Sequence, residues 1–395
     1  MKMRKTILCF AILALSLVTA SGKEPIKRLA DRVFEVASQH CIAMDATLDQ
    51  ETFPRSIKNG KFRTSKASWW CSGFYPGTLW YVYMYTGDQQ TKALAEKNTE
   101  KLYGESQIIR NHDIGFVINC SYGNAYRITG DQKWRQPIID AANLLATRYS
   151  PVTGVTKSWN TKKKKNAHMR FPVIIDNMMN LEILTQAYKL AGIDSLKAIA
   201  LSHADTTMKH HFRPDYTTWH VVDYDPVNGG VRGKQTAQGY SDDSAWARGQ
   251  AWAVYGYTMM FREVGEQRYL DQAENVARML LKKLPKDGIP YWDFDAPDIP
   301  NAYRDASAGA IMASAFIELS GYTKDRALSK ACMKMAEKQI RTLASDEYLA
   351  KPGENCNFIL KHSVGSLPSG SEVDVPLTYA DYYYLEALLR YLGKL

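Results

Sequence analysis

The chain has 395 residues and a formal net charge of +9. This basic balance suits an anionic substrate or reflects only a soluble surface with excess lysine, the densest basic run being Lys162–Lys165. Nucleic acid is a poor fit, because no known binding motif accompanies the charge. Apart from Cys9, five scattered cysteines lack CxxC spacing, and their odd number argues against a disulfide framework and a zinc site.

The first 20 residues predict a secretory signal peptide. Basic Lys2, Arg4 and Lys5 precede an apolar run over residues 6–18, and small residues follow. This run is too short for a comfortable membrane span, and no other segment could cross a bilayer. Cleavage near Ala20 would remove three positive charges, lowering the net charge from +9 to +6. We expect a secreted, periplasmic protein whose residues 21–395 form a single domain, because no Pro-, Ser- or Gly-rich linker interrupts them.

Six strongly apolar, aromatic-rich stretches recur along the rest of the chain, and each predicts a helix. Their starts lie roughly 60 residues apart, which is the length of two helices with their loops. An amphipathic helix with one charged face is predicted before each of them, the first over residues 26–44. The apolar stretches begin at Gly73, His112, Val173, Ser244, Asp305 and Asp374.

Helices that are apolar nearly all round belong inside a protein, and helices with one charged face belong outside. The alternation therefore predicts an all-α fold, an (α/α)6 toroid with six inner and six outer helices. The alternative is an open solenoid of helix pairs, because periodicity alone does not show that a ring closes.

The N-termini of the inner helices are the expected place for chemistry. In a toroid these helices run parallel, so their N-termini gather at one mouth and favour a carboxylate or sulfate there. Asp113, Asp176, Asp305 and Asp374 lie at or near four of these starts, and each is either an N-cap or a candidate catalyst. Asp113 stands beside His112, and Asp176 follows the apolar run PVII, where burial would raise its pKa.

The longest link between helices, residues 210–252, precedes the fourth inner helix. Within it WHVVDYDP predicts a short strand, NGG a turn and KQTAQGYSDDS a loop. A long insertion in a compact repeat is usually functional. Side chains here can donate hydrogen bonds, pair with an anion or stack on a sugar, although each also has a purely structural interpretation. They are His220, Gln238, Arg248 and Trp252.

Five motifs stand out along the chain: NHDIGF, PVIIDNMMNLEIL, HVVDYDP, QGYSDDSAWARGQAWAVYGYT and DVPLTYADYYYLEALLR. Together they resemble the unsaturated glucuronyl hydrolases, glycoside hydrolase family 88, over nearly the whole mature chain. The resemblance implies an (α/α)6 barrel, the fold that the helix pattern also predicts. It further implies that Asp176 is the general acid and base, with Asp113 as its carboxylate partner.

The resemblance also implies a set of substrate contacts: His112, His220, Gln238, Arg248 and Trp252, with Trp69 or Trp70 stacking on the sugar. Arg248 is our candidate for pairing with the uronate carboxylate. We expect no metal or cofactor, since carboxylates can handle both protonation and water activation. The family's sulfate-reading segment corresponds to residues 361–374, which carry Ser363, Ser366 and Ser369 but no lysine after Ser366.

The implied substrate is an oligosaccharide of glycosaminoglycan type, left by a polysaccharide lyase and ending in a 4,5-unsaturated uronic acid. Asp176 would protonate C4 of the vinyl ether and then take a proton from the water that attacks C5. Two alternatives stay open: an unsaturated rhamnogalacturonyl hydrolase, and a non-catalytic periplasmic protein that captures acidic oligosaccharides. The sequence carries no signal for the parent polysaccharide or for the oligomeric state.

Overall fold

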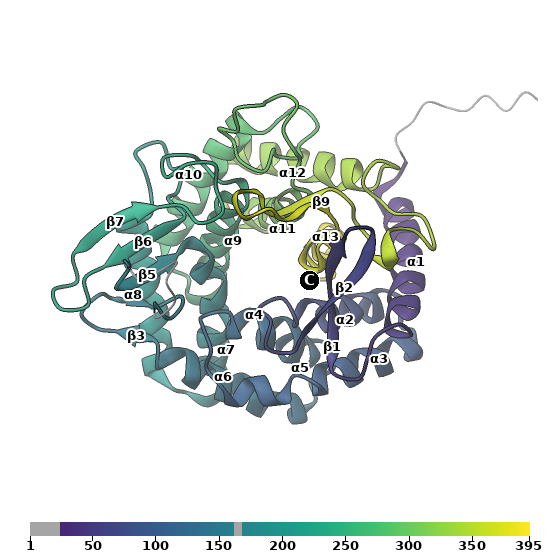
Figure 1. Cartoon of the computed structure of the whole chain (residues 1–395), viewed down its shortest axis with the longest axis horizontal. Helices are drawn as coiled ribbons and strands as arrows, with labels where there is room; N and C mark the ends of the chain where they lie inside the picture. The colour runs from purple at the N-terminus through teal and green to yellow at the C-terminus, as the bar shows by residue number, and fades with distance from the viewer. Residues whose placement is uncertain (1–23, 162–167) are drawn as a thin grey trace, which may run out of the picture.

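The computed structural model of this protein describes residues 24–161 and 168–395. The predicted signal peptide, residues 1–20, and the lysine run Lys162–Lys165 lie outside this part. Within it, no helix is both long and apolar enough to cross a membrane. The helices form two concentric layers around a central axis (Figure 1).

Outer and inner helices alternate along the chain. The outer layer holds α1 (Ile26–Asp45), α3 (Gln89–Glu100), α6 (Arg135–Ala146), α8 (Asp194–His210), α10 (Gln267–Lys283) and α12 (Arg326–Leu343). The inner layer holds α2 (Phe74–Thr86), the pair α4 (Ile114–Ile118) and α5 (Asn124–Thr129) joined by a π-helical turn, α7 (Leu181–Ala191), α9 (Ala247–Val264), α11 (Ala306–Tyr322) and α13 (Thr378–Tyr391).

The ring closes between the first and last inner helices. Helix α13 packs against α2, where the hydroxyl of Tyr81 donates a 2.9 Å hydrogen bond to that of Tyr382. In the outer layer, Arg32 of α1 donates to the backbone oxygen of Ala344, just after α12. The predicted (α/α)6 toroid is therefore confirmed, and the open solenoid is wrong.

The burial of each layer follows its composition. Every residue of α11 from Ala306 to Ile317 is buried, because both sides of an inner helix meet other helices. Helix α10 buries only a stripe that includes Leu270, Ala273, Val276 and Leu280, at three- and four-residue spacing. The two layers thus enclose one large apolar core.

All the described strands lie in links that lead from an outer helix to the next inner helix, so they crowd the mouth where the inner helices begin. Every pair is antiparallel: β1 (Thr52–Lys58) with β2 (Lys61–Lys66), β3 (Tyr149–Ser150) with β4 (Val155–Thr156), β5 (Phe171–Ile174) with β6 (Val221–Tyr224), β6 with β7 (Val231–Gln235), and β8 (Ser363–Ser366) with β9 (Ser371–Val375).

The starts of two inner helices differ from the prediction. The stretch from Val173 begins as the end of β5 and a 3-10 turn (Ile175–Asn180), because its β-branched residues are buried in pairing with β6. The last inner helix begins at Thr378 rather than Asp374, since the proline at position 376 disfavours helical backbone before it.

Candidate active site

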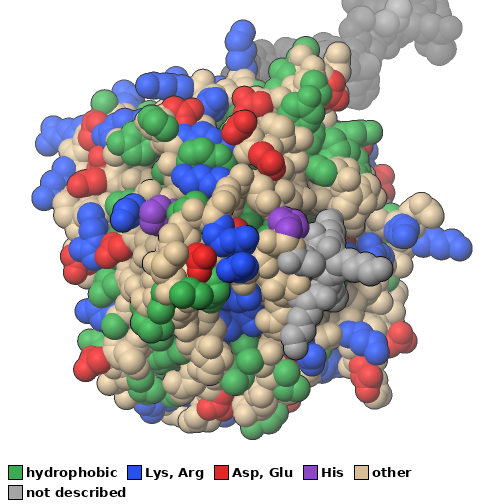
Figure 2. All heavy atoms as spheres, turned by 60° about the vertical axis from the view of Figure 1, so that its left-hand side comes forward, with side chains coloured by type: hydrophobic (Ala, Val, Ile, Leu, Met, Phe, Trp, Pro, Cys, Tyr) green, Lys and Arg blue, Asp and Glu red, His purple; other side chains and the backbone are tan. Residues whose placement is uncertain are grey.

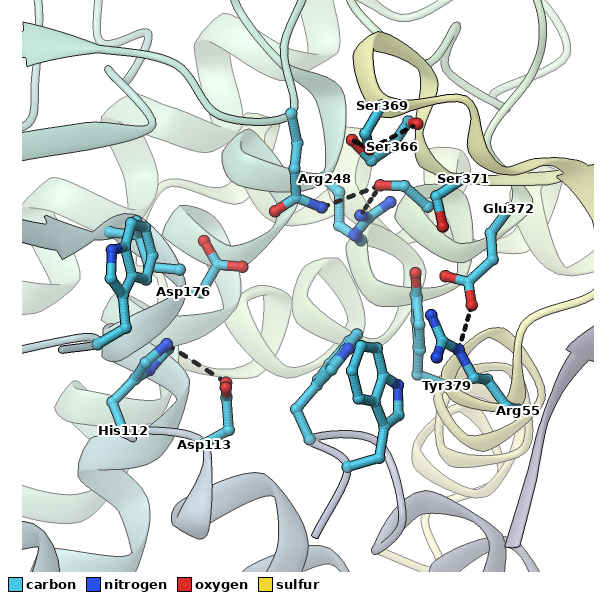
Figure 3. Close-up of a pocket in the computed structure, with 16 residues that line it drawn as sticks. Arg55, His112, Asp113, Asp176, Arg248, Ser366, Ser369, Ser371, Glu372 and Tyr379 are labelled. Atoms are coloured by element: carbon cyan, nitrogen blue, oxygen red, sulfur yellow. Dashed lines mark hydrogen bonds and ion pairs between the residues drawn. The ribbon is translucent and has the colours of Figure 1, made fainter. Parts of the chain in front are cut away.

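A cavity of about 270 Å³ opens at the mouth formed by the N-termini of the inner helices. Figure 3 shows Asp113, Asp176 and His112 on one side of it and Arg55 and Glu372 on the other. Seven of the nine predicted site residues line the cavity: Trp69, Trp70, His112, Asp113, Asp176, Gln238 and Arg248. The other two, His220 and Trp252, lie buried behind its wall.

Asp113 and Asp176 are the two carboxyls on one side of the cavity, across from Glu372. Burial raises the pKa of Asp113 to about 8, with the charge of Asp176 adding to the rise and Arg148 opposing it. Burial likewise raises the pKa of Asp176 to about 7, against the opposing charge of Arg248 and the nearby indole N–H of Trp252. Both carboxyls therefore retain protons near neutral pH and can act as general acids.

The other two aspartates have structural partners. The carboxylate of Asp305 accepts the backbone N–H groups of Ser307 and Ala308 and caps α11. Asp374 lies in β9, not at a helix start, and contacts His362 at 2.7 Å. Asp113 and Asp176 make no such capping bond, so their carboxyls remain available to a ligand.

Each of these two carboxyls faces a buried histidine. Nε2 of His112 lies 3.3 Å from Oδ1 of Asp113, and Nε2 of His220 lies 3.6 Å from Oδ2 of Asp176. Burial lowers the pKa of His220 to about 3 and that of His112 well below the ordinary value, so both imidazoles are neutral. We expected both as substrate contacts, and the structure places both next to the aspartates.

Three buried polar atoms around Asp176 lack a hydrogen-bond partner among the described residues: its own Oδ2, Nε2 of His220 and Nε1 of Trp252. Buried polar groups are normally paired, so this cluster suits a substrate hydroxyl or a water. Trp252 itself is fully buried and packs against Phe116 and Tyr383. Its ring therefore offers no stacking face to the cavity, and its indole N–H is buried beside Asp176.

Three hydrogen bonds from the terminal nitrogens of Arg248 fix its guanidinium group. Nη1 pairs with Asp305 at 2.9 Å and donates to the carbonyl of Val364, and Nη2 donates to the carbonyl of Gly365 at 2.7 Å. Arginine has five N–H donors, so the N–H of Nε and one N–H of Nη2 make no hydrogen bond to another described residue. Gln238 binds the same C-terminal segment, because its Nε2 donates a 2.9 Å hydrogen bond to the carbonyl of Gly365.

The two neighbouring tryptophans line the cavity in different ways. Trp69 is 37% exposed, and the guanidinium of Arg55 stacks on it at 3.8 Å. Trp70 packs against Phe74, Phe116 and Tyr379. Both remain candidates for stacking on the sugar.

The sequence analysis did not identify the cavity wall that lies opposite Asp113 and Asp176. It comprises Arg55 from β1, Glu372 from β9, and Tyr379 from α13, together with Ser371. Nε of Arg55 pairs with Oε1 of Glu372 at 2.5 Å, while its terminal nitrogens have no bond to another described residue. The Asn59-Gly60 pair, a strong hairpin signal between alternating residues, could have predicted the β1–β2 hairpin but not which cavity it enters.

Positive charge is dispersed on the face of the molecule that Figure 2 shows. On the face shown in Figure 2, Lys and Arg side chains lie among Asp and Glu side chains. The net charge of the chain therefore does not locate the site, whereas the arginines of the cavity do. No group of three His, Cys, Asp or Glu among residues 24–161 and 168–395 could hold a metal ion.

Comparison with known proteins agrees with this geometry. An unsaturated glucuronyl hydrolase from Formosa agariphila is 40% identical, over 98% of this chain and 98% of its own. An unsaturated chondroitin disaccharide hydrolase from Streptococcus pyogenes is 32% identical, over 87% of this chain and 86% of its own. The crystal structure of an unsaturated glucuronyl hydrolase specific for heparin has a TM-score of 0.89 and 44% identity, covering 93% of this chain and 98% of that one. Since the sequence model of Glycosyl Hydrolase Family 88 also matches residues 44–391, the chain belongs to this family and is a glycosidase.

Proposed function

We propose that this protein is an unsaturated glucuronyl hydrolase. It removes the terminal 4,5-unsaturated uronic acid from lyase-generated oligosaccharides of glycosaminoglycan type. The observation that carries the proposal is the pair of largely buried carboxyls that line the cavity, Asp113 (17% exposed) and Asp176 (13% exposed), whose pKa values are raised to about 8 and about 7. A proton held near neutral pH is what hydration of a vinyl ether needs.

The reaction needs no attack on the anomeric carbon. The carboxyl of Asp176 gives its proton to C4, and positive charge develops on C5 and the ring oxygen. Water adds to C5 and returns a proton to Asp176, so the catalyst is regenerated. The resulting hemiketal opens to a ketone at C5, and the hemiacetal left at C1 releases the rest of the oligosaccharide as an alcohol. The spacing rule for retaining and inverting glycosidases does not apply to this route.

Arg248 supports recognition of the uronate carboxylate. Its three bonds to Asp305, Val364 and Gly365 fix the guanidinium plane, and its two remaining donors lie along one edge. Two parallel donors match a carboxylate, a geometry that lysine could not copy.

Arg55 supports recognition of a second anionic group. It stands across the cavity from the aspartates, 11% exposed, and its terminal nitrogens make no hydrogen bond to another described residue. A sulfate or carboxylate on the sugar next to the unsaturated uronate would meet these donors. One similar structure is named as specific for heparin and one relative as a chondroitin disaccharide hydrolase, so we propose a glycosaminoglycan product as the substrate here. We also propose secretion to the periplasm, where such oligosaccharides would be met, on the strength of the N-terminal sequence.

The test is a panel of unsaturated disaccharides from chondroitin, hyaluronan, heparin and pectic sources, followed by loss of the ultraviolet absorbance of the conjugated uronate. We expect turnover of at least one glycosaminoglycan disaccharide. Binding of these disaccharides without any loss of absorbance would overturn the proposal.

A further inference from the structure

The buried layer beneath Asp113 contains an asparagine whose orientation is fixed. Asn180 ends the 3-10 turn before α7 and is 1% exposed. Its Oδ1 lies 2.7 Å from the backbone nitrogen of Phe116. Because a backbone N–H can only donate, that atom must be the amide oxygen. The NH2 group of Asn180 therefore faces Nδ1 of His112, at 3.1 Å.

This contact determines where His112 carries its proton. The NH2 group of Asn180 is a donor, so Nδ1 of His112 must accept, and a neutral imidazole then has its single proton on Nε2. Nε2 is the atom that lies 3.3 Å from Oδ1 of Asp113. His112 thus presents an N–H group, rather than a lone pair, to the carboxyl of Asp113.

The backbone of α4 lies very close to Asn180 at Gly115. A Cβ atom on Gly115, in the first turn of α4, would lie 2.3 Å from Oδ1 of Asn180 and 2.7 Å from its Cβ. Only glycine lets α4 approach closely enough for the bond from Phe116. The contact is therefore built into the packing of α4 against the 3-10 turn.

The histidine that faces Asp176, His220, is held in the same tautomer. Nδ1 of His220 accepts the backbone N–H groups of Ala237 at 3.1 Å and Gln238 at 3.3 Å. Its proton must also sit on Nε2, which faces Oδ2 of Asp176. Two unrelated sets of donors thus impose the same tautomer on the two histidines.

We propose that Asn180 is a positioning residue, which holds His112 in the Nε2–H tautomer so that its N–H group faces the carboxyl of Asp113, 3.3 Å away, and favours the carboxylate form. The assignment rests on the proposed function, because it gives Asn180 a part in the reaction only if Asp113 belongs to the catalytic pair. The other charged groups that act on Asp113 are Asp176 and Arg148. Those that act on His112 are Arg148 and, when protonated, His203 and His220.

The tautomer can be measured in the wild-type protein without any variant of Asn180. With 15N-labelled histidine, the signals of His112 are assigned by their loss in His112→Gln. We expect a protonated Nε2 and an unprotonated Nδ1 throughout the neutral range. A proton on Nδ1 of His112 would overturn the proposal, whether or not the protein turns over any sugar.

The variant Asn180→Asp reverses the contact while keeping its shape. A carboxylate still accepts from Phe116 but can no longer donate to His112, so Nδ1 of His112 must take a proton. We expect this proton in the 15N spectrum and a fall in kcat of at least about tenfold, since a wrong histidine tautomer disables a His–Asp couple. We also expect a shifted pH profile and a KM within about threefold. An unchanged pH profile and kcat would show that the tautomer has no part in the reaction.

Asn177→Asp is the matched control. Asn177 lies in the same 3-10 turn and is equally buried, but it bonds Ser158 and Thr156 and not His112. We expect the His112 signals of this variant to match those of the wild type. If Asn177→Asp moved the signals and the pH profile as Asn180→Asp does, buried charge alone would explain the effect and the proposal would fail. The proposed function is tested separately: it fails if the wild-type protein does not turn over any unsaturated disaccharide, whatever the tautomer of His112.

Discussion

Replacing Asp176 with asparagine should abolish turnover and yet stabilise the fold at alkaline pH. The substitution removes the proton that reaches C4 but leaves a side chain of the same shape. General acid and base catalysis is worth about 10²- to 10⁴-fold, so we expect kcat to fall by about 10³-fold. The assay is loss of the ultraviolet absorbance of an unsaturated disaccharide.

The stability effect follows from the raised pKa of Asp176, about 7 in the fold against an ordinary 3.8. Because the folded state prefers the protonated form, wild-type stability is lost as the pH rises from about 4 to about 7, and the loss levels off above that. The full difference between the two pKa values corresponds to about 4 kcal/mol, and the side chain is only 13% exposed. Asparagine carries no charge to bury, so the variant escapes this loss.

Urea denaturation of both proteins at about pH 5 and about pH 8.5 measures the difference. The variant should match the wild type or be slightly less stable at the lower pH, and exceed it by up to about 4 kcal/mol at the higher. Identical pH dependence of the two unfolding free energies would show that the carboxyl of Asp176 is not held protonated by burial. Wild-type turnover by the variant would refute its role as the acid.

Three further outcomes are expected. First, kcat/KM should fall as the pH rises through about 7 to 8, where the carboxyl pair loses its protons, and activity that still rises above this range would contradict the assignment. Second, Arg55→Gln should raise KM about tenfold for a disaccharide with a sulfate next to the uronate, since a charge-assisted bond is worth about 1.5–3 kcal/mol, while the unsulfated disaccharide serves as the control. Third, Gly115→Ala should cost about 1–3 kcal/mol in urea denaturation because its Cβ would overlap Asn180, whereas Gly104→Ala, with no atom within 4 Å of its Cβ, should cost little.

The helical ring could be predicted from sequence because its two layers differ in composition. An inner helix such as α11 is apolar on all sides, whereas an outer helix such as α10 buries one stripe. Local sequence did not show that the ring closes. Closure depends on contacts between residues far apart in the chain, such as Tyr81 with Tyr382, and the helix period contains no information about such pairs.

The strands at the mouth were harder to predict for the same reason. Strand β6 was found from its alternating residues, but β5 looked like the start of a helix, because its apolar residues pair with a partner strand some 50 residues further on. The wall formed by Arg55 and Glu372 joins strands from opposite ends of the chain. These residues could not be predicted as part of one site, because β1 and β9 lie side by side only once the ring has closed.

Asp113, a proposed member of the catalytic pair, differs from the helix-capping Asp305 in backbone conformation, which the sequence does not display. Asp305 has the extended backbone of an N-cap, with φ −117° and ψ 93°, so its carboxylate turns back onto the N–H groups of α11. Asp113 occupies the equivalent position before α4 but has helical angles, φ −69° and ψ −2°, and makes no capping bond. Its own backbone N–H is instead taken by the side chain of Asn111. A residue with helical backbone at this position cannot fold its carboxyl onto the turn that follows, so the carboxyl projects into the cavity. The same residue type at the same place in the repeat thus caps one helix and, before another, leaves its carboxyl free for the chemistry we propose.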